Sequence, residues 1–583
     1  MSGAVAEVCE GPLQRPHRLA QVFDRLRPYP ILRCIHLLQL RGPLETMDFG
    51  HLTVGWDEDL QQLIFVGWSS ENPPRPKQAF SVSQRSDFPE VGAGPQATLD
   101  IKKIPIANIA EDAHTWSKCF GIVGALLCDG VWSVVVASSR KEIGTLDGDK
   151  WYYVASVHNF DLATSSRAHQ SVLDRTVSMF ETGALYFSTG KERALVPRHL
   201  RDTDDCHNFF WNKGALKELI NKELAGFTLV CIYGFARMIS ITAPDQSPAT
   251  PFASLSYDIW LIARRDTRRA GPRYMRRGCD NSGNTANSVY SEQIVIPLRA
   301  AHPRSSHFSL IRGSVPLVWS QPLNLAFTPK AKVDDSAELQ RRCLEASLKI
   351  LAKSHANVAF LNLLKIGPTS HEGKLTAAFE KHTTVAADLK VVKDRDTDNQ
   401  VRHLRGSFQG NCVEYLSFDL NTEGKSGRTP YVERALEALM KCVQPRVVEW
   451  GVGVVNPDNA AEIKRQAGVF RVNCLDSLDR TNLVQMHVAR VGLDLQLRQL
   501  NLPTTSHVPT LQREHQLLWV DHGDDISKFY SGACSCRPGQ YSRVRLIFFL
   551  QELVRCTARS HARARRRLWE CCVTQGCRAL GFT

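Results

Sequence analysis

Residues 471–482 read Arg-Val-Asn-Cys-Leu-Asp-Ser-Leu-Asp-Arg-Thr-Asn, and this stretch decides the fold that we expect. The apolar segment Gly468–Val472 leads into it and predicts a buried strand. After it, apolar residues recur at helical spacing from Val484 to Leu495, which predicts an amphipathic helix starting near Arg480. A strand, a tight polar turn and a helix in this order are typical of an α/β domain.

The turn itself has the composition of a phosphate-binding loop. Cys474 is followed six residues later by Arg480. Between them, a tight turn can aim successive backbone N–H groups at one phosphate, and an arginine adds a bidentate fork. The following helix contributes its positive end. We expect this field to lower the pKa of the cysteine, so that its thiolate can attack phosphorus.

The spacing alone is weak evidence, because the chain contains it four times. The other three pairs are Cys9/Arg15, Cys231/Arg237 and Cys572/Arg578. Cys231 lies in an apolar segment and is predicted to be a core thiol. Only Cys474 has a strand before it, a helix after it and two acids, Asp476 and Asp479, inside the loop. The competing interpretation of Cys474 is a structural thiol at the end of a strand.

Residues 471–482 resemble the catalytic motif of Sac-domain phosphoinositide phosphatases, Arg-x-Asn-Cys-x-Asp-Cys-Leu-Asp-Arg-Thr-Asn. Further blocks resemble the same family at residues 209–212, 273–294, 307–321 and 519–532. The chain departs from the family pattern at Val472, Ser477, Asn421, Gly424, Ser288 and Tyr290. None of these changes removes the nucleophile, the arginine or the two acids, but they can alter substrate choice.

The resemblance implies an α/β fold, α+β overall, in which a β-rich N-terminal lobe precedes a cysteine-phosphatase-like catalytic domain. We place the lobe at residues 1–205, the catalytic domain at 206–545 and a basic segment at 546–583. Strands are predicted at Gln62–Trp68, Gly121–Cys128, Val131–Ala137, Trp151–Val157, Phe227–Tyr233, Ser254–Ala263 and Val413–Leu420. Helices are predicted over Phe209–Leu224 and Asp335–Ala356, and surface loops over Glu71–Gln96 and Lys393–Arg405.

By this resemblance Cys474 is the nucleophile, Arg480 the phosphate clamp, and Asp476 or Asp479 the proton donor. Which aspartate acts stays open. The remaining residues expected to bind substrate are Asn473, Leu475, Ser477, Leu478, Thr481, Arg276 and Arg277. Arg276 and Arg277 belong to a run of arginines between residues 264 and 277 that either binds an anionic headgroup or forms a solvated loop with internal ion pairs.

The composition indicates in which compartment the protein works and which kinds of partner it binds. The net charge is +13, which attracts anionic partners, and no RNA- or DNA-binding motif accompanies it. No secretory signal or bilayer-spanning apolar run is present, and the 17 cysteines predict reduced thiols. The cysteines at 534–536 and 571–577 lack zinc-site spacing, so we expect neither a metal nor another cofactor. We expect a cytoplasmic protein that binds anionic membranes peripherally and lacks the family's membrane anchor or second phosphatase domain.

The resulting hypothesis is a phosphoinositide phosphatase that removes a phosphate monoester from the inositol ring through a cysteinyl-phosphate. The expected substrate is phosphatidylinositol 4-phosphate or another monophosphate. The main alternative is a catalytically silent phosphoinositide-binding or scaffold module with the same fold. A phosphoprotein substrate is disfavoured, because the loop carries acids where protein tyrosine phosphatases have glycines.

Overall fold

The structure is a computed structural model of the 583-residue chain. It describes residues 51–531 apart from 88–95, 110–112, 114–115, 165–169, several positions within 171–183, 191, 202, 221–223, 245–253, 272–274, 299–303, 323–328, 393–400, 421–428 and 457–460. The predicted basic segment 546–583, the cysteines at 534–536 and 571–577, Asn421 and Gly424 lie outside the described residues. Within them, no helix has both the length and the apolar character needed to cross a bilayer.

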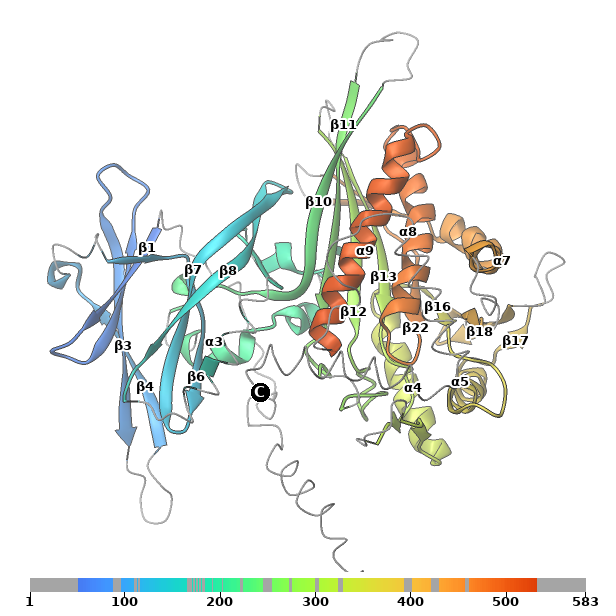
Figure 1. The fold of residues 1–583 in the computed structure, drawn as a ribbon, viewed down its shortest axis with the longest axis horizontal. Helices are drawn as coiled ribbons and strands as arrows, with labels where there is room; N and C mark the ends of the chain where they lie inside the picture. The colour runs from blue at the N-terminus through green and yellow to red at the C-terminus, as the bar shows by residue number, and fades with distance from the viewer. Residues whose placement is uncertain are drawn as a thin grey trace, which may run out of the picture.

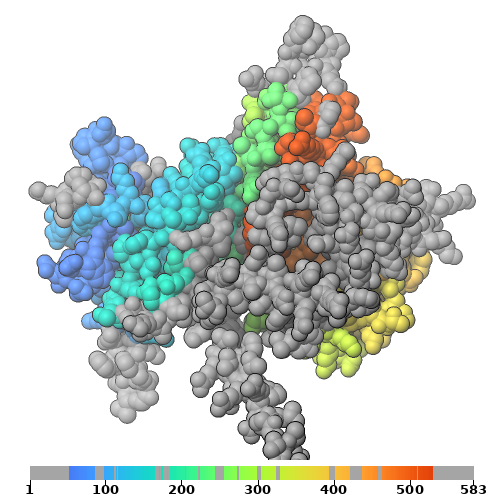
Figure 2. All heavy atoms as spheres, viewed as in Figure 1, coloured from blue at the N-terminus to red at the C-terminus, as the bar shows by residue number. Residues whose placement is uncertain are grey.

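A five-stranded antiparallel sheet lies at one end of the molecule, drawn in blue in Figures 1 and 2. Its strand order is β4-β3-β2-β1-β5. The strands are β1 (His51–Asp57), β2 (Gln62–Trp68), β3 (Pro76–Asp87), β4 (Gln96–Ile104) and β5 (Ser117–Cys119). Leu63, Phe65 and Phe80 from this sheet pack against β6, β7 and helix α3 (Lys213–Ile220) in one core.

A second sheet of 15 strands runs from the N-terminal half into the helical part of the molecule (Figure 1). Its main path is β17-β18-β19-β16-β22-β13-β12-β11-β10-β9-β8-β7-β6, and β20 and β21 extend from β13. The N-terminal strands are β6 (Ile122–Cys128), β7 (Val131–Leu146), β8 (Asp149–Asp161), β9 (Leu185–Ser188), β10 (Ile232–Pro244), β11 (Ser254–Arg265) and β12 (Val289–Pro297). The others are β13 (Ser305–Arg312), β16 (Asn357–Asn362), β17 (Lys390–Val391), β18 (Arg402–Phe408), β19 (Asn411–Ser417), β20 (Gly453–Asn456), β21 (Ala461–Lys464) and β22 (Gly468–Asn473). A separate pair joins β14 (Trp319–Ser320) to β15 (Lys332–Val333).

Four neighbouring strands of this sheet, β13, β22, β16 and β19, run parallel to one another. Helices cover both faces, as expected for buried parallel strands. One face packs against α7 (Thr429–Trp450), α8 (Asp479–Gln499) and α9 (Pro509–Ser531). The other packs against α4 (Ala337–Ala352) and α5 (His371–Ala387). Phe470 and Val472 of β22 point to the first face and Val469 to the second, which is the alternation of a strand buried on both sides.

Some sequence predictions of elements were wrong. Residues 76–87 form β3 where a loop was expected, because the alternating Phe80 and Val82 fill a core despite the surrounding Pro and Ser residues. The segment 227–233 is largely irregular, and β10 begins only at Ile232. Residues 402–405, expected in a loop, belong to β18, which pairs with β19 over its whole length.

The mixed α/β fold class is confirmed. The boundary predicted near residue 205 stays a prediction; one sheet continues across it through the pairing of β9 with β10. The strand–turn–helix expected at residues 468–495 is present as β22 and α8.

Candidate functional site

The candidate site is the loop that joins β22 to α8. Cys474 follows the last residue of β22, and its side chain is buried. The backbone N–H of Ser477 donates to the Cys474 Sγ over 3.1 Å, so the loop curls around the sulfur. This curl requires Ser477 to adopt a φ of 54°, in the left-handed region. The Ser477 hydroxyl donates to the Gly313 carbonyl at 2.7 Å, which ties the strained residue to the end of β13.

Arg480 lies in the first turn of α8, and its charge acts on Cys474. Its Nη1 donates to the Leu363 carbonyl and to Glu372 Oε2, both at 3.0 Å, and its Nη2 donates to Glu372 Oε1 at 3.2 Å. The side chains of Arg480 and Glu372 are only 11% and 10% exposed. Glu372 stands in the first turn of α5, whose N-terminus is capped by Ser370. A bidentate ion pair therefore fixes the guanidinium beside the cysteine.

Arg277 anchors the opposite side of the loop. Its Nη1 donates to the Leu475 carbonyl at 3.0 Å and its Nη2 to Asp476 Oδ1 at 2.5 Å. The arginine is buried, and its guanidinium lies 5.5 Å from the centre of the Trp319 ring. The structure thus joins Arg277 to the loop through the Asp476 carboxylate.

Four other residues that were predicted to bind substrate are Asn473, Leu478, Thr481 and Arg276. Asn473 donates through its side chain to the Asn362 side chain of β16 at 2.7 Å, rather than to the backbone of the turn. Leu478 precedes α8 as its N-cap residue, and Thr481 donates to the Leu478 carbonyl at 2.8 Å. Arg276 is half-buried and lies against Gly271.

The prediction that the loop lowers the pKa of the Cys474 thiol was wrong. Burial raises the pKa of Cys474 above its ordinary value, although the Arg480 charge lowers it, and the nearby Asp476 carboxylate adds to the increase. Glu372 behaves differently: burial alone would raise its pKa, but Arg480 and the Lys365 amide hold that pKa below the usual range.

Sequence reasoning missed two charged groups beside the loop, Glu372 and Arg312. Arg312 ends β13 and is fully buried, and Cys474 and Asp479 both act electrostatically on it. It belongs to the block 307–321, but the resemblance of this block to the family did not predict a role for Arg312. Glu372 belongs to α5, which contains none of the blocks that resemble the family. The one local signal for this residue was its position shortly after the N-cap Ser370.

Comparison with known proteins gives the family. The family model described as SacI homology domain matches residues 120–425. The chain belongs to this family. "Phosphoinositide phosphatase SAC6" of Arabidopsis thaliana is 30% identical over 438 residues, 71% of this chain and 66% of the relative. "Phosphoinositide phosphatase SAC7" of the same plant is 29% identical over 437 residues, again 71% and 66%.

A mouse relative, "Phosphatidylinositide phosphatase SAC2", is 28% identical over 356 residues, 58% of this chain and 28% of its own length. The chain thus spans just under two thirds of the length of the plant relatives and less of the mouse protein. The SacI homology match includes Arg277, Arg312 and Glu372, and it ends before Cys474. The loop and the residues that surround it therefore come from both sides of the match boundary.

The arginine run within this SacI homology region is mostly internal. Arg264 is buried and donates to Glu292 at 3.0 Å, and Arg268 forms ion pairs with Asp266 and Asp205. These contacts favour internal ion pairing over a membrane-facing patch for the residues that make them. Cys231, the other described cysteine of the Cys–Arg pairs, is fully buried just before β10, which confirms its prediction as a core thiol.

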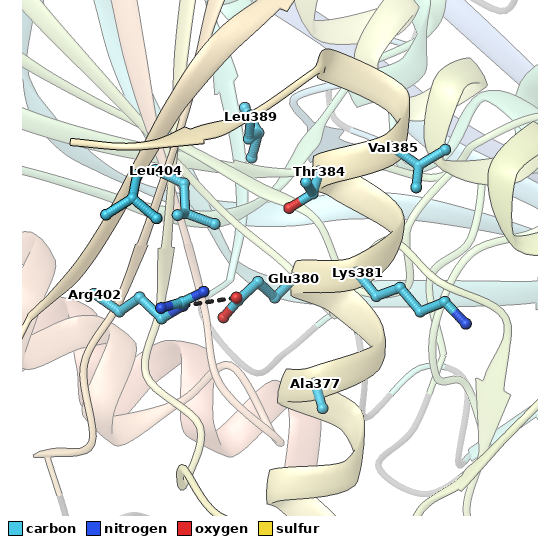
Figure 3. A pocket seen from close by; sticks show the side chains of 9 residues that line it. Ala377, Glu380, Lys381, Thr384, Val385, Leu389, Arg402 and Leu404 are labelled. Carbon is cyan, nitrogen blue, oxygen red and sulfur yellow. Dashed lines mark hydrogen bonds and ion pairs between the residues drawn. The ribbon is translucent and has the colours of Figure 1, made fainter.

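A recess of about 520 Å³ lies elsewhere on the SacI homology fold, between α5 and strands β17 and β18 (Figure 3). Glu380 and Arg402 face each other across it and form an ion pair at 2.6 Å. The residues that line it include none from the loop 474–480. Among the described residues, no three His, Cys, Asp or Glu side chains converge as a metal site would require.

Proposed function

We propose that the chain is a phosphoinositide phosphatase whose nucleophile is Cys474. One observation carries the proposal: the β22–α8 loop curls around the Cys474 sulfur, with the Ser477 N–H at 3.1 Å, and Glu372 holds the guanidinium of Arg480, whose charge acts on that sulfur. Such a turn at a helix N-terminus is suited to a phosphate dianion. The names of the plant and mouse relatives support the same substrate class.

In the proposed reaction the Cys474 thiolate attacks phosphorus, a sulfur–phosphorus bond forms, and the bond to the inositol oxygen breaks. A carboxylic acid, Asp476 or Asp479, transfers a proton to the departing oxygen, and the resulting carboxylate then takes a proton from water. That water attacks phosphorus, releasing inorganic phosphate and the thiolate. Arg480 binds the equatorial oxygens, on which the transition state concentrates charge. Asn473, Leu475, Ser477, Leu478 and Thr481 shape the loop, and its backbone N–H groups bind the phosphate.

The proposed substrate is a phosphatidylinositol monophosphate, with phosphatidylinositol 4-phosphate first among the candidates. Of the two aspartates within the loop, Asp476 and Asp479, the one that does not donate the proton is a carboxylate and repels an additional phosphate next to the reacting one, which favours a singly phosphorylated ring. We also propose that the protein works in the cytoplasm and reaches the lipid as a peripheral protein, aided by its net charge of +13. Flotation with anionic liposomes tests the membrane step: protein that stays at the bottom of the gradient contradicts it.

Phosphate release from a panel of short-chain phosphoinositides and phosphopeptides tests the function. Wild type is compared with Cys474→Ser and with Cys231→Ser, a matched control at the other described Cys–Arg pair. We expect release from a lipid monophosphate, loss of at least 1000-fold in Cys474→Ser, and normal release in Cys231→Ser, because only the thiolate at 474 forms the covalent intermediate.

The alternative is a silent module that binds phosphoinositide without turnover. The burial of Cys474 and the resulting raised pKa of its thiol are the observations that favour it, since a neutral thiol is a poor nucleophile. Folded wild-type protein that binds the lipids in flotation and releases no phosphate from any of them supports this alternative and removes the catalytic roles.

A further inference from the structure

Arg312 is the buried arginine whose charge lacks a hydrogen-bond acceptor. It is 0% exposed, and none of its three guanidinium nitrogens has a hydrogen-bond partner among the described residues. Other buried arginines of the same sheet differ. Arg264 donates to Leu195 and Glu292, and Arg471 donates to Thr285 and to the Ser314 carbonyl. A buried guanidinium with no acceptor is costly unless an anion comes to it.

The sheet register places this guanidinium beside the catalytic loop. Arg312 is paired with Val472 in the parallel ladder between β13 and β22. Phe308 and Leu310 of β13 pack on the α8 face, so the alternation of the strand turns Arg312 to that same face. Cys474 belongs to the α8-face core and lies two residues beyond Val472. By strand geometry the two Cα atoms are about 8 Å apart, within reach of an arginine side chain.

Arg312 interacts electrostatically with the Cys474 thiol and with Asp479. Burial lowers the pKa of Arg312 to about 10, while Cys474 and Asp479 oppose that decrease and Arg265 adds to it. Burial and the Arg312 charge hold the pKa of His522 well below its usual range. The charged groups that act on the sulfur are Arg480 on α8, Asp476 in the loop and Glu372 on α5. Arg312 on β13 interacts with the sulfur and with Asp479 of α8.

We propose that Arg312 is the counter-ion of the Cys474 thiolate, held beneath the first turn of α8 where the sulfur ionises. Arg480 also acts on the sulfur, but its guanidinium has acceptors in Glu372 and Leu363, whereas the guanidinium of Arg312 lacks an acceptor among the described residues. Arg312 is therefore a positioning residue: it acts on the nucleophile and does not itself contact the phosphate. This inference rests on the proposed function, because only a reactive thiolate needs a counter-ion.

The test follows thiolate formation directly, without turnover. Iodoacetamide alkylates Cys474 as the thiolate displaces iodide, and mass spectrometry of the peptide that contains Cys474 gives the rate at each pH. We expect Arg312→Met to raise the midpoint of the pH profile by at least one unit, a tenfold lower rate at a fixed pH below the midpoint. Arg312→Lys keeps the charge and should return the midpoint to within half a unit of wild type.

Arg264→Met is the matched control, because Arg264 is equally buried in the same sheet and paired with Glu292. A general loosening of the core would shift Arg264→Met and Arg312→Lys as much as Arg312→Met. An unchanged midpoint in folded Arg312→Met overturns the inference. If thermal melting shows that Arg312→Met does not fold, Cys474→Asp is compared with Cys474→Asn in the native background. With a counter-ion present, the aspartate variant melts at or above the asparagine variant; a melting temperature lower by several degrees overturns the inference.

The two proposals fail separately. If the wild-type protein releases phosphate but Arg312→Met keeps the wild-type alkylation midpoint, the proposed function stands and the counter-ion role of Arg312 is rejected. If Arg312→Met shifts the alkylation midpoint but the wild-type protein hydrolyses no phosphoinositide, the counter-ion role stands and the proposed function is rejected.

Discussion

Replacing Glu372 by glutamine should weaken both the fold and the reaction. Glu372 accepts two hydrogen bonds from Arg480 and one from the Lys365 N–H at 3.0 Å, and the pair is about nine-tenths buried. Removing one partner of a buried ion pair typically costs 3–5 kcal/mol. Glutamine keeps one acceptor oxygen, so we expect a loss of about 2–3 kcal/mol in the free energy of unfolding. Because Arg480 loses its orientation, kcat/KM should fall about 10- to 100-fold.

Glu380→Gln on the same helix is the matched control. Glu380 also pairs with an arginine, Arg402, but that arginine is 52% exposed (Figure 3). Exposed pairs contribute roughly 0–1 kcal/mol, so Glu380→Gln should lose less than about 1 kcal/mol and keep full activity. Urea unfolding midpoints and phosphate release are measured for both variants. Equal destabilisation of the two, or normal turnover in Glu372→Gln, would refute the reasoning.

The pH dependence of the same variant gives a further check. Arg480 and the Lys365 amide overcome the effect of burial and hold the pKa of Glu372 below its usual value. A group whose pKa is lower in the folded state contributes stability above its unfolded pKa, about 4.3 for glutamate. That stability is lost as the pH falls through the lower folded pKa. The stability difference between wild type and Glu372→Gln should therefore be constant near pH 7 and shrink below about pH 4.

Four other substitutions have expected outcomes. Asp479→Asn should slow phosphate release from an inositol lipid more than from p-nitrophenyl phosphate, because the leaving group of the latter needs no proton. Asp476→Asn should slow release from both substrates equally, because it breaks the ion pair with Arg277. Kinetics with the two substrates are measured in parallel, and the reverse pattern would make Asp476 the proton donor and Asp479 the structural residue. Ser477→Ala keeps the φ of 54° and loses one hydrogen bond of 2.7 Å, so urea unfolding should show a loss of about 1 kcal/mol, and no loss would mean that the bond contributes nothing. Glu414→Gln removes a fully buried carboxylate bonded to His403 and Arg446, each at 2.7 Å, and should lower the unfolding free energy by about 3 kcal/mol; a loss under 1 kcal/mol contradicts a structural role.

The sequence predicted those parts of the fold that depend on local patterns. The β22–loop–α8 unit was predictable because an apolar run, a polar turn and a helical repeat follow one another within 28 residues, 468–495. Strand β3 was missed because proline and serine in the same segment hid the alternation of Phe80 and Val82. The helical spacing of Leu339, Cys343, Ala346 and Ile350 predicts one inner face for α4, but of these four only Cys343 is buried. The rest of the buried face is formed by Gln340, Leu344, Ser347, Leu348 and Leu351.

The partners of the loop could not be predicted from local patterns. Arg480 meets Glu372 across 108 residues of chain, and Arg277 meets Asp476 across 199. Such pairs depend on which strands are neighbours, and strand order is not encoded in periodicity. Arg277 was predicted only through the family resemblance of its block, and Arg312 and Glu372 were not predicted at all.

The order of the parallel strands explains why these distant residues meet. β13 ends at Arg312, β16 ends just before Leu363, and β22 ends just before Cys474, and these three strands are neighbours that run in the same direction. Their carboxyl ends therefore reach one edge of the sheet, where parallel α/β folds bind their ligands. The Leu363 carbonyl accepts a hydrogen bond from Arg480, the Gly313 carbonyl accepts one from Ser477, and the buried Arg312 interacts electrostatically with Cys474. Each strand end thus fixes a different part of the loop. A shift of β13 by one residue against β22 would turn Arg312 to the opposite face and remove its charge from the sulfur.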